Sequence, residues 1–464
     1  MRRPAFEDLF FALIASALAV SLGIACWHDV SQGYDVWYYH LPFAARIVGL
    51  TSPATYGLSA ENFARYEGFP LFAELLQGLV WRLTGHVAAT SFVALGGLFA
   101  LVVFVRRIFA APMAIALLAL LAIPLVQIHA TAGYIDLPAN AAATMLLLLV
   151  LRALVAGTVS RQALVGAALL SAATANMKFQ LVPIVLAAAV VLVVLALRER
   201  DGRGARLAIL ALAFPLVFAT PLKNLALHGN PVWPVELTAL GHPFPHVEGA
   251  YAQSPPQLRD ASRPVRFARS VLEVDNHPIG AHRWSLDQWA PAEDPACRMG
   301  GYFGVYVVVN LLALGLAVLR RLHLALVAGG LFAGVTAIAA IVPQSHELRY
   351  YMHWMLLLVC LNVIMWTRER LPRFVVGLVA LTALGIVAWS TEGGYLYASG
   401  TSFDAYLAKR VDARVIDAAA PHERLCIARE PFTFLYAPLF HPGRDYAVQE
   451  HDVDRDCQDA RVVP

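Results

Sequence analysis

The sequence contains little charge. Asp, Glu, Lys and Arg make up 14% of its 464 residues, whereas hydrophobic residues make up 59%, and the mean hydropathy is +0.61. Average soluble proteins carry about 25% charged residues, so this composition excludes a soluble enzyme and indicates a polytopic membrane protein. The net charge of +3 is spread along the chain and forms no basic patch, so we expect no nucleic-acid partner.

Cysteine is scarce as well. The five cysteines are too few for a disulfide framework, although Cys426 and Cys457, which lie outside the apolar segments, can pair. The histidines at 242, 246, 277 and 282 share the segment 228–302, but their spacing fits no known metal site. We therefore predict no metal ligands and leave a divalent metal cofactor open.

The sequence also lacks a convincing signal-peptide cleavage site and an internal repeat. The first apolar segment is not followed by the small-x-small pattern at which signal peptides are cleaved, so we expect this segment to be retained as the first helix. Many secondary transporters are built from repeated halves, and none is evident here.

Long apolar runs dominate what is present. A bilayer core requires roughly 20 apolar residues per helix. Such segments lie near 9–27, 87–105, 111–129, 137–152, 163–177, 181–197, 206–225, 303–319, 323–342, 351–367 and 374–391. We therefore expect an all-α polytopic protein with about eleven transmembrane helices.

Arginines predict the orientation of these helices. The clusters are Arg2 and Arg3, Arg106 and Arg107, Arg152 and Arg161, the segment 198–206, Arg320 and Arg321, and the segment 368–373. They fall at alternate ends of the expected spans, so the positive-inside rule makes those ends cytoplasmic. The N-terminus is then cytoplasmic and the C-terminus periplasmic. The alanine-rich, arginine-dominated composition is typical of a GC-rich bacterium, which indicates an inner membrane.

The segment 69–83 is apolar but short, and it contains Glu74, Gln77 and Arg82. We interpret it as a helix that lies at the membrane interface or re-enters it, with a tilted extra span as the alternative. One added crossing here would put every later arginine cluster on the wrong side.

Most polar residues gather on the predicted outer face. The outer regions are a first loop 28–86, a long loop 228–302 and a C-terminal segment 392–464. The long loop is rich in Pro, His and Arg, so we expect an irregular segment with short helices that can cover a site. After a transmembrane domain at 1–391, two strand-like stretches at 423–429 and 445–449 predict a small α/β appendage.

The stretch "GYDVWYYHLP" (33–42) places an acid among aromatic residues at the outer mouth of the bundle. Partial desolvation there would raise the pKa of Asp35 and make it a better proton acceptor. Trp37 and Tyr39 can stack on sugar rings, and His40 can bind sugar hydroxyls. The alternative is an interfacial aromatic belt with a solvated acid.

A second acid, Asp136, lies in "AGYIDLPAN" (132–140), the next outer turn. It precedes Pro138 at the start of a helix, so simple helix capping is the alternative reading. Its context repeats that of Asp35, since both acids lie at outer helix ends, next to tyrosine and before Leu-Pro. We expect the fold to bring the two acids together.

Only three lysines occur, Lys178, Lys223 and Lys409. The first two fall at outer helix ends, where the positive-inside tendency disfavours a basic residue. A lipid phosphate on the outer side would explain them. The alternative is snorkelling of the side chains to the interface.

The segment "PQSHELRYYMHW" (343–354) is a fourth outer cluster. Helical spacing puts the following side chains on one face of a helix that begins near residue 347: His346, Arg349 or Tyr350, and His353. Arg349 can donate two hydrogen bonds to a phosphate. The alternative pairs it with Glu347 or Glu74.

Six motifs occur together in one order: "GYDVWYYHLP", "YEGFPLFAELLQGLVWRLTG", "YIDLP", "NMKF", "GNPVWP" and "LRYY". In this order they resemble bacterial members of the GT-C superfamily, multi-spanning glycosyltransferases that use polyprenyl-phosphate-linked sugars. The resemblance covers residues 5–390 and implies a GT-C-like transmembrane fold with an active site on the outer face.

The resemblance implies roles for particular residues. Asp35 would act as base or acceptor anchor and Asp136 as the second acid, and Lys178 and Arg349 would hold the lipid phosphate. The other candidate substrate-binding residues are Trp37, Tyr39, His40, Glu74, His346 and Tyr350. A single acid at position 35, where better-characterised branches have paired acids, puts metal dependence in doubt. The short C-terminal segment favours a lipid or small glycan acceptor.

The sequence therefore predicts inverting transfer of a sugar from a polyprenyl-phosphate carrier, with Asp35 removing the proton of the acceptor hydroxyl. One alternative is a secondary transporter or lipid flippase, although such proteins place ionisable groups near the bilayer midplane. The other is a non-catalytic membrane protein that binds the carrier lipid.

Overall fold

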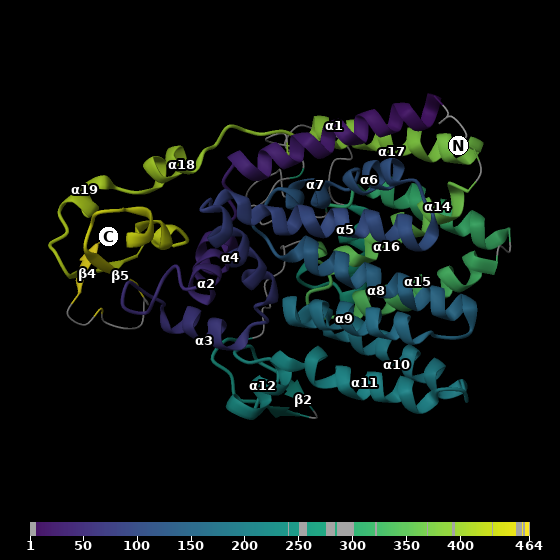
Figure 1. The fold of residues 1–464 in the computed structure, drawn as a ribbon, viewed down its shortest axis with the longest axis horizontal. Helices are drawn as coiled ribbons and strands as arrows, with labels where there is room; N and C mark the ends of the chain where they lie inside the picture. The colour runs from purple at the N-terminus through teal and green to yellow at the C-terminus, as the bar shows by residue number, and fades with distance from the viewer. Residues whose placement is uncertain are drawn as a thin grey trace.

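A computed structural model describes residues 6–239, 241–249, 258–274, 284, 301–320, 323–368, 370–391, 395–428, 430–451, 457 and 460–463. Long helices form a bundle along the long axis of the molecule, and a small sheet lies beyond one end of that bundle (Figure 1). Helix α1 (Phe6–His28) begins at the end of the bundle opposite to the sheet.

The bundle is built from α1 and twelve further helices. They are α5 (Phe92–Phe109), α6 (Met113–Leu121), α7 (Pro124–Ala130), α8 (Asp136–Ala156), α9 (Arg161–Met177), α10 (Val182–Arg198), α11 (Arg203–Val217), α12 (Ala219–His228), α14 (Gly304–Leu319), α15 (His323–Ile341), α16 (Met352–Trp366) and α17 (Arg370–Ser390). Helices α8 and α16 are buried over most of their length and form the centre. Helix α8 packs on α5, α9 and α16, so it connects the helices that lead to the site.

Each of the eleven apolar segments expected from the sequence contains helix. Within the described residues, seven helices are long and apolar enough to cross a membrane, or up to nine if two bent pairs each count as one span. The remaining segments form α9, with 17 residues, and α14, with 16. The prediction of a polytopic helical protein is confirmed, whereas the number eleven stays a prediction.

Two expected spans are broken by proline. Helices α6 and α7 meet at 99°, and α11 and α12 meet at 55°. Ile123 is extended before Pro124, as the ring of a following proline requires. Pro221 similarly removes a backbone donor in the first turn of α12 and crowds the carbonyl of Val217, the last residue of α11. The first break is important for the site because the turn after α7 leads directly into α8.

The helix ends agree with the grouping of arginines in the sequence. Arg370 and Arg373, at the start of α17, pair with Glu7 and Asp8, at the start of α1. Arg320, after α14, lies over the ring of Trp366 at the end of α16. These predicted cytoplasmic ends therefore lie together, while the side of the membrane that they face stays a prediction.

The first outer loop is mostly helical. It contains the π-helical turn η1 (Val36–His40), α2 (Leu41–Ile47), α3 (Ala60–Gly68) and α4 (Phe72–Thr84), and the 3₁₀ turn η2 (Ala88–Ser91) follows the loop directly before α5. Helix α4 corresponds to the segment 69–83. Its 13 residues are too few to cross a bilayer, and it buries Glu74 and Gln77 against its neighbours.

The C-terminal segment forms the predicted α/β unit, with a strand that the sequence did not indicate. Helices α18 (Phe403–Arg410) and α19 (Ala413–Asp417) precede strands β4 (Glu423–Ile427), β5 (Tyr446–Glu450) and β6 (Arg461–Val463). Between β4 and β5 lie the 3₁₀ turns η6 (Phe432–Tyr436) and η7 (Pro438–Phe440). The sheet has the order β1-β5-β4-β6, and its strands are parallel. Strand β1 (Tyr56–Gly57) comes from the first outer loop.

The first outer loop and the C-terminal segment consequently share one hydrophobic core. Tyr56 and Phe434 are fully buried, with ring centroids 4.9 Å apart. The buried carboxylate of Glu450 closes the contact, since it accepts hydrogen bonds from the Tyr56 hydroxyl, the Ser59 backbone N–H (2.9 Å) and the Asn62 amide (3.0 Å). The C-terminal segment thus supports the loop that contains Asp35.

The long outer loop 228–302 is described in part. It contains the short hairpin strands β2 (Thr238–Ala239) and β3 (His242–Pro243) and helix α13 (Arg263–Leu272). Glu273, just after α13, accepts hydrogen bonds from the backbone N–H groups of Gly301 and Phe303 and from the Trp284 indole. This buried acid holds the end of the loop on the bundle. Much of the expected covering segment lies outside the described residues.

Candidate active site

Asp35 and Arg349 meet at the end of the bundle that carries the first outer loop. Asp35 directly precedes η1, and Arg349 lies in the 3₁₀ turn η5 (Leu348–Tyr351) at the start of α16. The Arg349 Nη1 atom donates to Asp35 Oδ2 at 2.8 Å, and both side chains are 19% exposed. The fold thus joins two motifs that are more than 300 residues apart in the sequence.

A second pair lies in the same place. Asp136 is the first residue of α8, and Lys178 lies between α9 and the 3₁₀ turn η3 (Phe179–Leu181). The Lys178 ammonium contacts the Asp136 carboxylate. Lys178 is 8% exposed and Asp136 is 1% exposed. A buried pair of this kind is stable only because each charge faces the other.

Tyr350 connects the two pairs. Its ring lies under the Lys178 Nζ atom, 4.2 Å from the centroid, and under the Arg349 guanidinium, at 5.1 Å. Tyr134, in the turn before α8, lies under Arg349 from another direction, at 5.7 Å. These cation–π contacts hold two cations close together beside two acids. The four charged groups therefore form one cluster, which we call the acid–base cluster: Asp35, Asp136, Lys178 and Arg349.

The backbone around the acid–base cluster is fixed by Asn140 of α8. Its side-chain amide donates to the carbonyl of Asp136 (2.8 Å) and to that of Arg349 (3.1 Å). Its Oδ1 atom accepts from the backbone N–H and the ring Nδ1–H of His353, each at 2.9 Å. One buried amide thereby sets the distance between the helix starts that carry Asp136 and Arg349.

The electrostatics differ from the expectation for Asp35. Burial by itself raises the pKa of this carboxyl, but the charges of Arg349 and His40 outweigh it and hold the pKa below its ordinary value. The expected rise was wrong because the sequence does not show that Arg349 lies beside the acid. Burial lowers the pKa of the Lys178 ammonium, and the Asp136 carboxylate opposes that change.

Trp37 has a different place from the one expected. Its side chain is fully buried and packs on Tyr406 and Phe434 of the C-terminal segment, while its indole N–H donates to the Ser31 carbonyl at 2.7 Å. No face of the indole is open to a sugar. The sugar-stacking role is therefore corrected to a packing role, because η1 turns this side chain toward the appendage.

His40 and Glu74 form a buried pair behind Asp35. The His40 Nδ1 atom lies 2.8 Å from Glu74 Oε1, and each residue is 2% exposed. The ring of Tyr39 lies next to that of His40, with centroids 4.4 Å apart. His40 and Tyr39 both interact electrostatically with Asp35, and of the three residues only Tyr39 is partly exposed.

His346 lies just before the helical segment that carries Arg349 and His353. The helix expected near residue 347 begins at Leu348 as a 3₁₀ turn and continues from Met352 as α16. His346 is 6% exposed, and its carbonyl accepts from the Ser270 hydroxyl of α13. The sequence indicated Glu347 only as an alternative partner of Arg349. Its Oε2 atom lies 3.3 Å from the Arg349 Nε atom.

Lys223 lies apart from the acid–base cluster. Its ammonium donates to the carbonyl of Glu67 near the end of α3. The neighbouring Asn224 amide donates to the carbonyl of Gly68 at 2.7 Å. The lysine therefore ties α12 to the first outer loop, and only one of the two outer lysines belongs to the candidate site.

Arg65 is a functional candidate that the sequence reasoning missed. It forms two hydrogen bonds with Glu248 of the long outer loop, at 2.8 and 3.0 Å. Its guanidinium also lies over the rings of Tyr38 and Tyr39, at 5.5 and 5.8 Å from their centroids. Arg65 thus holds the long loop over η1. Its position inside an ordinary amphipathic helix gave no signal of this role.

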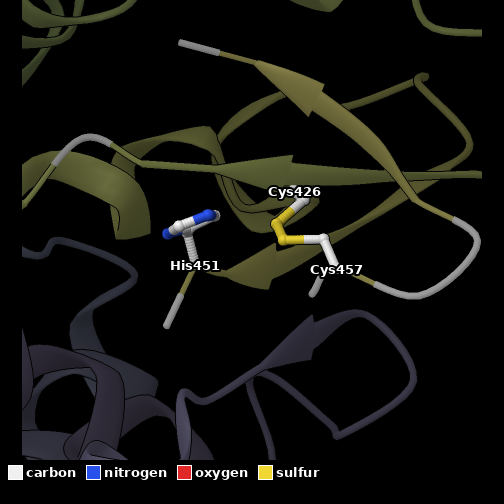
Figure 2. Close-up of side chains that lie close together, drawn as sticks. All are labelled: Cys426, His451 and Cys457. Carbon is white, nitrogen blue, oxygen red and sulfur yellow. A yellow bond between two sulfur atoms is a disulfide. The ribbon is translucent and has the colours of Figure 1, made fainter. Parts of the chain in front are cut away.

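The acid–base cluster does not resemble a divalent-metal site, because each acid already faces a cation and such sites gather several oxygen ligands. Elsewhere in the described part of the chain, Cys426, His451 and Cys457 have donor atoms within 4.8 Å of one another. Cys426 and Cys457 form a disulfide beside His451 (Figure 2). The disulfide uses both sulfurs, so this group could bind a metal only after reduction.

Comparisons with known proteins bear on the fold of the whole chain. No family model matches the chain, and no curated protein matches it. Two solved structures of ArnT from Cupriavidus metallidurans are similar to it. The apo form has a TM-score of 0.53 and 15% sequence identity, with 96% of this chain and 89% of that chain covered. The form bound to undecaprenyl phosphate has a TM-score of 0.55 and 14% identity, with 95% and 89% covered.

At this identity the likeness concerns the fold, and it extends over nearly the whole chain, including the C-terminal segment. ArnT is a GT-C glycosyltransferase. The sequence motifs resemble those of the GT-C superfamily, and the structural comparison shows that this chain has an ArnT-like fold.

Proposed function

We propose that this protein is a glycosyltransferase of the bacterial inner membrane that moves a sugar from a polyprenyl-phosphate carrier to an acceptor hydroxyl on the outer face. The observation that carries the proposal is the acid–base cluster, in which two cations and two acids from four distant segments meet at one end of the bundle. The likeness to an ArnT structure bound to undecaprenyl phosphate supports a carrier of this chemistry.

Lys178 and Arg349 would bind the phosphate of the donor. Their charges lie over one tyrosine ring, so both can approach a single anion. An ammonium acts as a point charge and a guanidinium donates in a fixed fork, and together they can neutralise the charge that develops on the departing phosphate. In the structure Asp136 faces Lys178 and Asp35 faces Arg349, so a donor phosphate would compete with these two acids.

Asp35 would act as the base. While Arg349 binds it, the carboxylate is a poor proton acceptor because its pKa is held low. A donor phosphate that draws Arg349 away would remove that stabilisation, and the carboxylate could then accept the proton of the acceptor hydroxyl. Donor binding would thus prepare the base. Asp136 would remain beside Lys178 and keep its ammonium in place.

Substitution of Asp35 tests this proposal. A general base contributes about 10²–10⁴-fold to turnover, so Asp35→Asn should block transfer while the carrier still binds. Lipid mass spectrometry of the gently purified protein should find free carrier with the wild type and the sugar-linked carrier with Asp35→Asn. Asp404→Asn, which changes an exposed acid of α18, should behave as wild type.

Other outcomes would count against the proposal. If only bulk phospholipid co-purified with both proteins, the carrier would lose its support and a transporter would become the better reading. If Asp35→Asn turned over like the wild type, Asp35 would not be the base. A carrier that stays without sugar in both proteins would favour a non-catalytic lipid-binding protein.

A further inference from the structure

A third buried acid lies beside the acid–base cluster. Glu347, directly before η5, is 4% exposed, and its Oε2 atom lies 3.3 Å from the Arg349 Nε atom. The same guanidinium donates through Nη1 to Asp35 Oδ2 at 2.8 Å. The Arg349 guanidinium therefore contacts two carboxylates, one through Nε and the other through Nη1.

The charge count is uneven as a result. With every group ionised, the acids Asp35, Asp136 and Glu347 face the cations Lys178 and Arg349. Arrival of a phosphate would add at least one more negative charge to this partly buried place. An uncompensated buried charge costs several kcal/mol, so a carboxylate that loses its share of Arg349 is expected to become neutral.

We propose that Glu347 is a proton-binding site coupled to the donor phosphate: its carboxylate takes up a proton from solvent when the phosphate engages Arg349, and it releases that proton when the phosphate leaves. The inference rests on the proposed function and extends it to the carrier-binding step. Asp35 is more exposed than Glu347, so in this proposal Asp35 is the acid that stays ionised.

The surroundings of Glu347 support this assignment. The charged groups that act on it are Arg349 from its own turn, Asp136 of α8 and Lys178 from the turn after α9, and it in turn acts on the phenols of Tyr350 and Tyr351. Burial raises the pKa of the Glu347 carboxyl to about 7, although Arg349 opposes the rise. A bound anion would raise the pKa further.

Calorimetry of carrier binding tests the inference. We would titrate undecaprenyl phosphate into the full-length protein at pH 8, in two buffers with different ionisation enthalpies, and obtain the number of protons exchanged per lipid bound. The lipid phosphate has its own ionisation near pH 6, so a methyl ester of the lipid, a phosphodiester without that ionisation, is the second probe. With the diester, the wild type should take up close to one proton, and Glu347→Gln should take up none.

The affinity provides an independent measurement. Between the free and the bound pKa of Glu347, the Kd of the wild type for the diester should rise up to tenfold for each unit of pH. The Kd of Glu347→Gln should depend much less on pH. Glu450→Gln is the matched control, since Glu450 is also a buried acid but belongs to the contact with the C-terminal segment, and it should keep the proton uptake.

The outcomes separate this inference from the proposed function. Equal proton uptake in wild type and Glu347→Gln would overturn the role of Glu347 while leaving the carrier site intact. Absence of lipid binding by the wild type would instead contradict the carrier itself. If Glu347→Gln fails to fold, Glu347→Asp serves in its place, because the shorter acid still titrates but loses contact with Arg349, and an unchanged pH dependence would then overturn the inference.

Discussion

Two buried acid sites in this molecule look alike at first and differ in their partners. Glu450 accepts hydrogen bonds from a hydroxyl, a backbone N–H and an amide, all of them neutral. The acids of the acid–base cluster face Lys178 and Arg349. The neutral donors around Glu450 belong to the fold contact itself, whereas a cation that faces a carboxylate can bind another anion in its place. The comparison distinguishes an acid that holds the fold from acids that can give way to a substrate.

Replacing both members of a charged pair is the strongest test of this comparison. Lys178→Met should destabilise the protein by about 3–5 kcal/mol, because Asp136 is left buried and unpaired. The double variant Lys178→Met, Asp136→Leu should recover most of that stability, as apolar replacements of buried pairs often do. Its turnover of sugar-linked carrier should nevertheless stay at least 10²-fold below wild type, since a phosphate-binding cation is missing.

Thermal unfolding and the ratio of sugar-linked to free carrier in membranes would measure the two effects. A double variant that regained turnover together with stability would mean that the pair is structural, like Glu450.

Removal of the disulfide should have the next largest effect on stability. The disulfide lies in the C-terminal segment, which is the part of the molecule that Glu450 holds in place. Cys426 and Cys457 are separated by 31 residues, and closing a loop of that size stabilises a protein by roughly 2–4 kcal/mol. Cys457→Ser should therefore lower the unfolding temperature of the C-terminal segment, measured by limited proteolysis at increasing temperature. Carrier binding at low temperature should be unchanged, and its loss there would show that the segment contacts the lipid.

Glu450→Gln should have the smallest effect, and its pH dependence sharpens the distinction. Burial raises the pKa of Glu450 above its ordinary value, so the folded state binds this proton more tightly than the unfolded state. The contribution of Glu450 to the free energy of unfolding therefore increases as the pH falls from 7 through the pKa of the folded state. This contribution stops increasing below the pKa of the unfolded state, which is about 4.3.

The difference in unfolding temperature between wild type and Glu450→Gln should accordingly grow in favour of the wild type as the pH is lowered from 7 to 5. At pH 7 the substitution should lower the free energy of unfolding by about 1–3 kcal/mol. The NH₂ group of glutamine is a donor, and it would replace a carboxylate oxygen that accepts from two N–H donors. A difference that shrinks on acidification would show that Glu450 is held ionised, as the acids of the acid–base cluster are.

The sequence predicts local features of this molecule well. Apolar length indicates the helices, and the repeated context of Asp35 and Asp136 indicates that both acids lie at outer helix ends. The strands β4 and β5 also follow from local patterning. Such signals depend only on residues near one another in the chain.

Other features depend on contacts between distant segments and could not be predicted in this way. Asp35 has a lowered pKa only because Arg349 reaches it from the far end of the sequence. Trp37 is buried only because the C-terminal segment packs on η1. Strand β1 is two residues long and becomes a strand only by pairing with β5. No pattern within residues 33–57 contains this information.

The pairing of β1 with β5 also bears on how the protein is made. Tyr56 and Gly57 emerge from the ribosome almost 400 residues before their partners Val448 and Gln449, so the first outer loop cannot form this pairing until the last segment has been synthesised. The turn that carries Asp35 is therefore completed at the end of biogenesis. A chain that stops before β5 would contain every residue of the acid–base cluster and still lack the pairing that supports this turn.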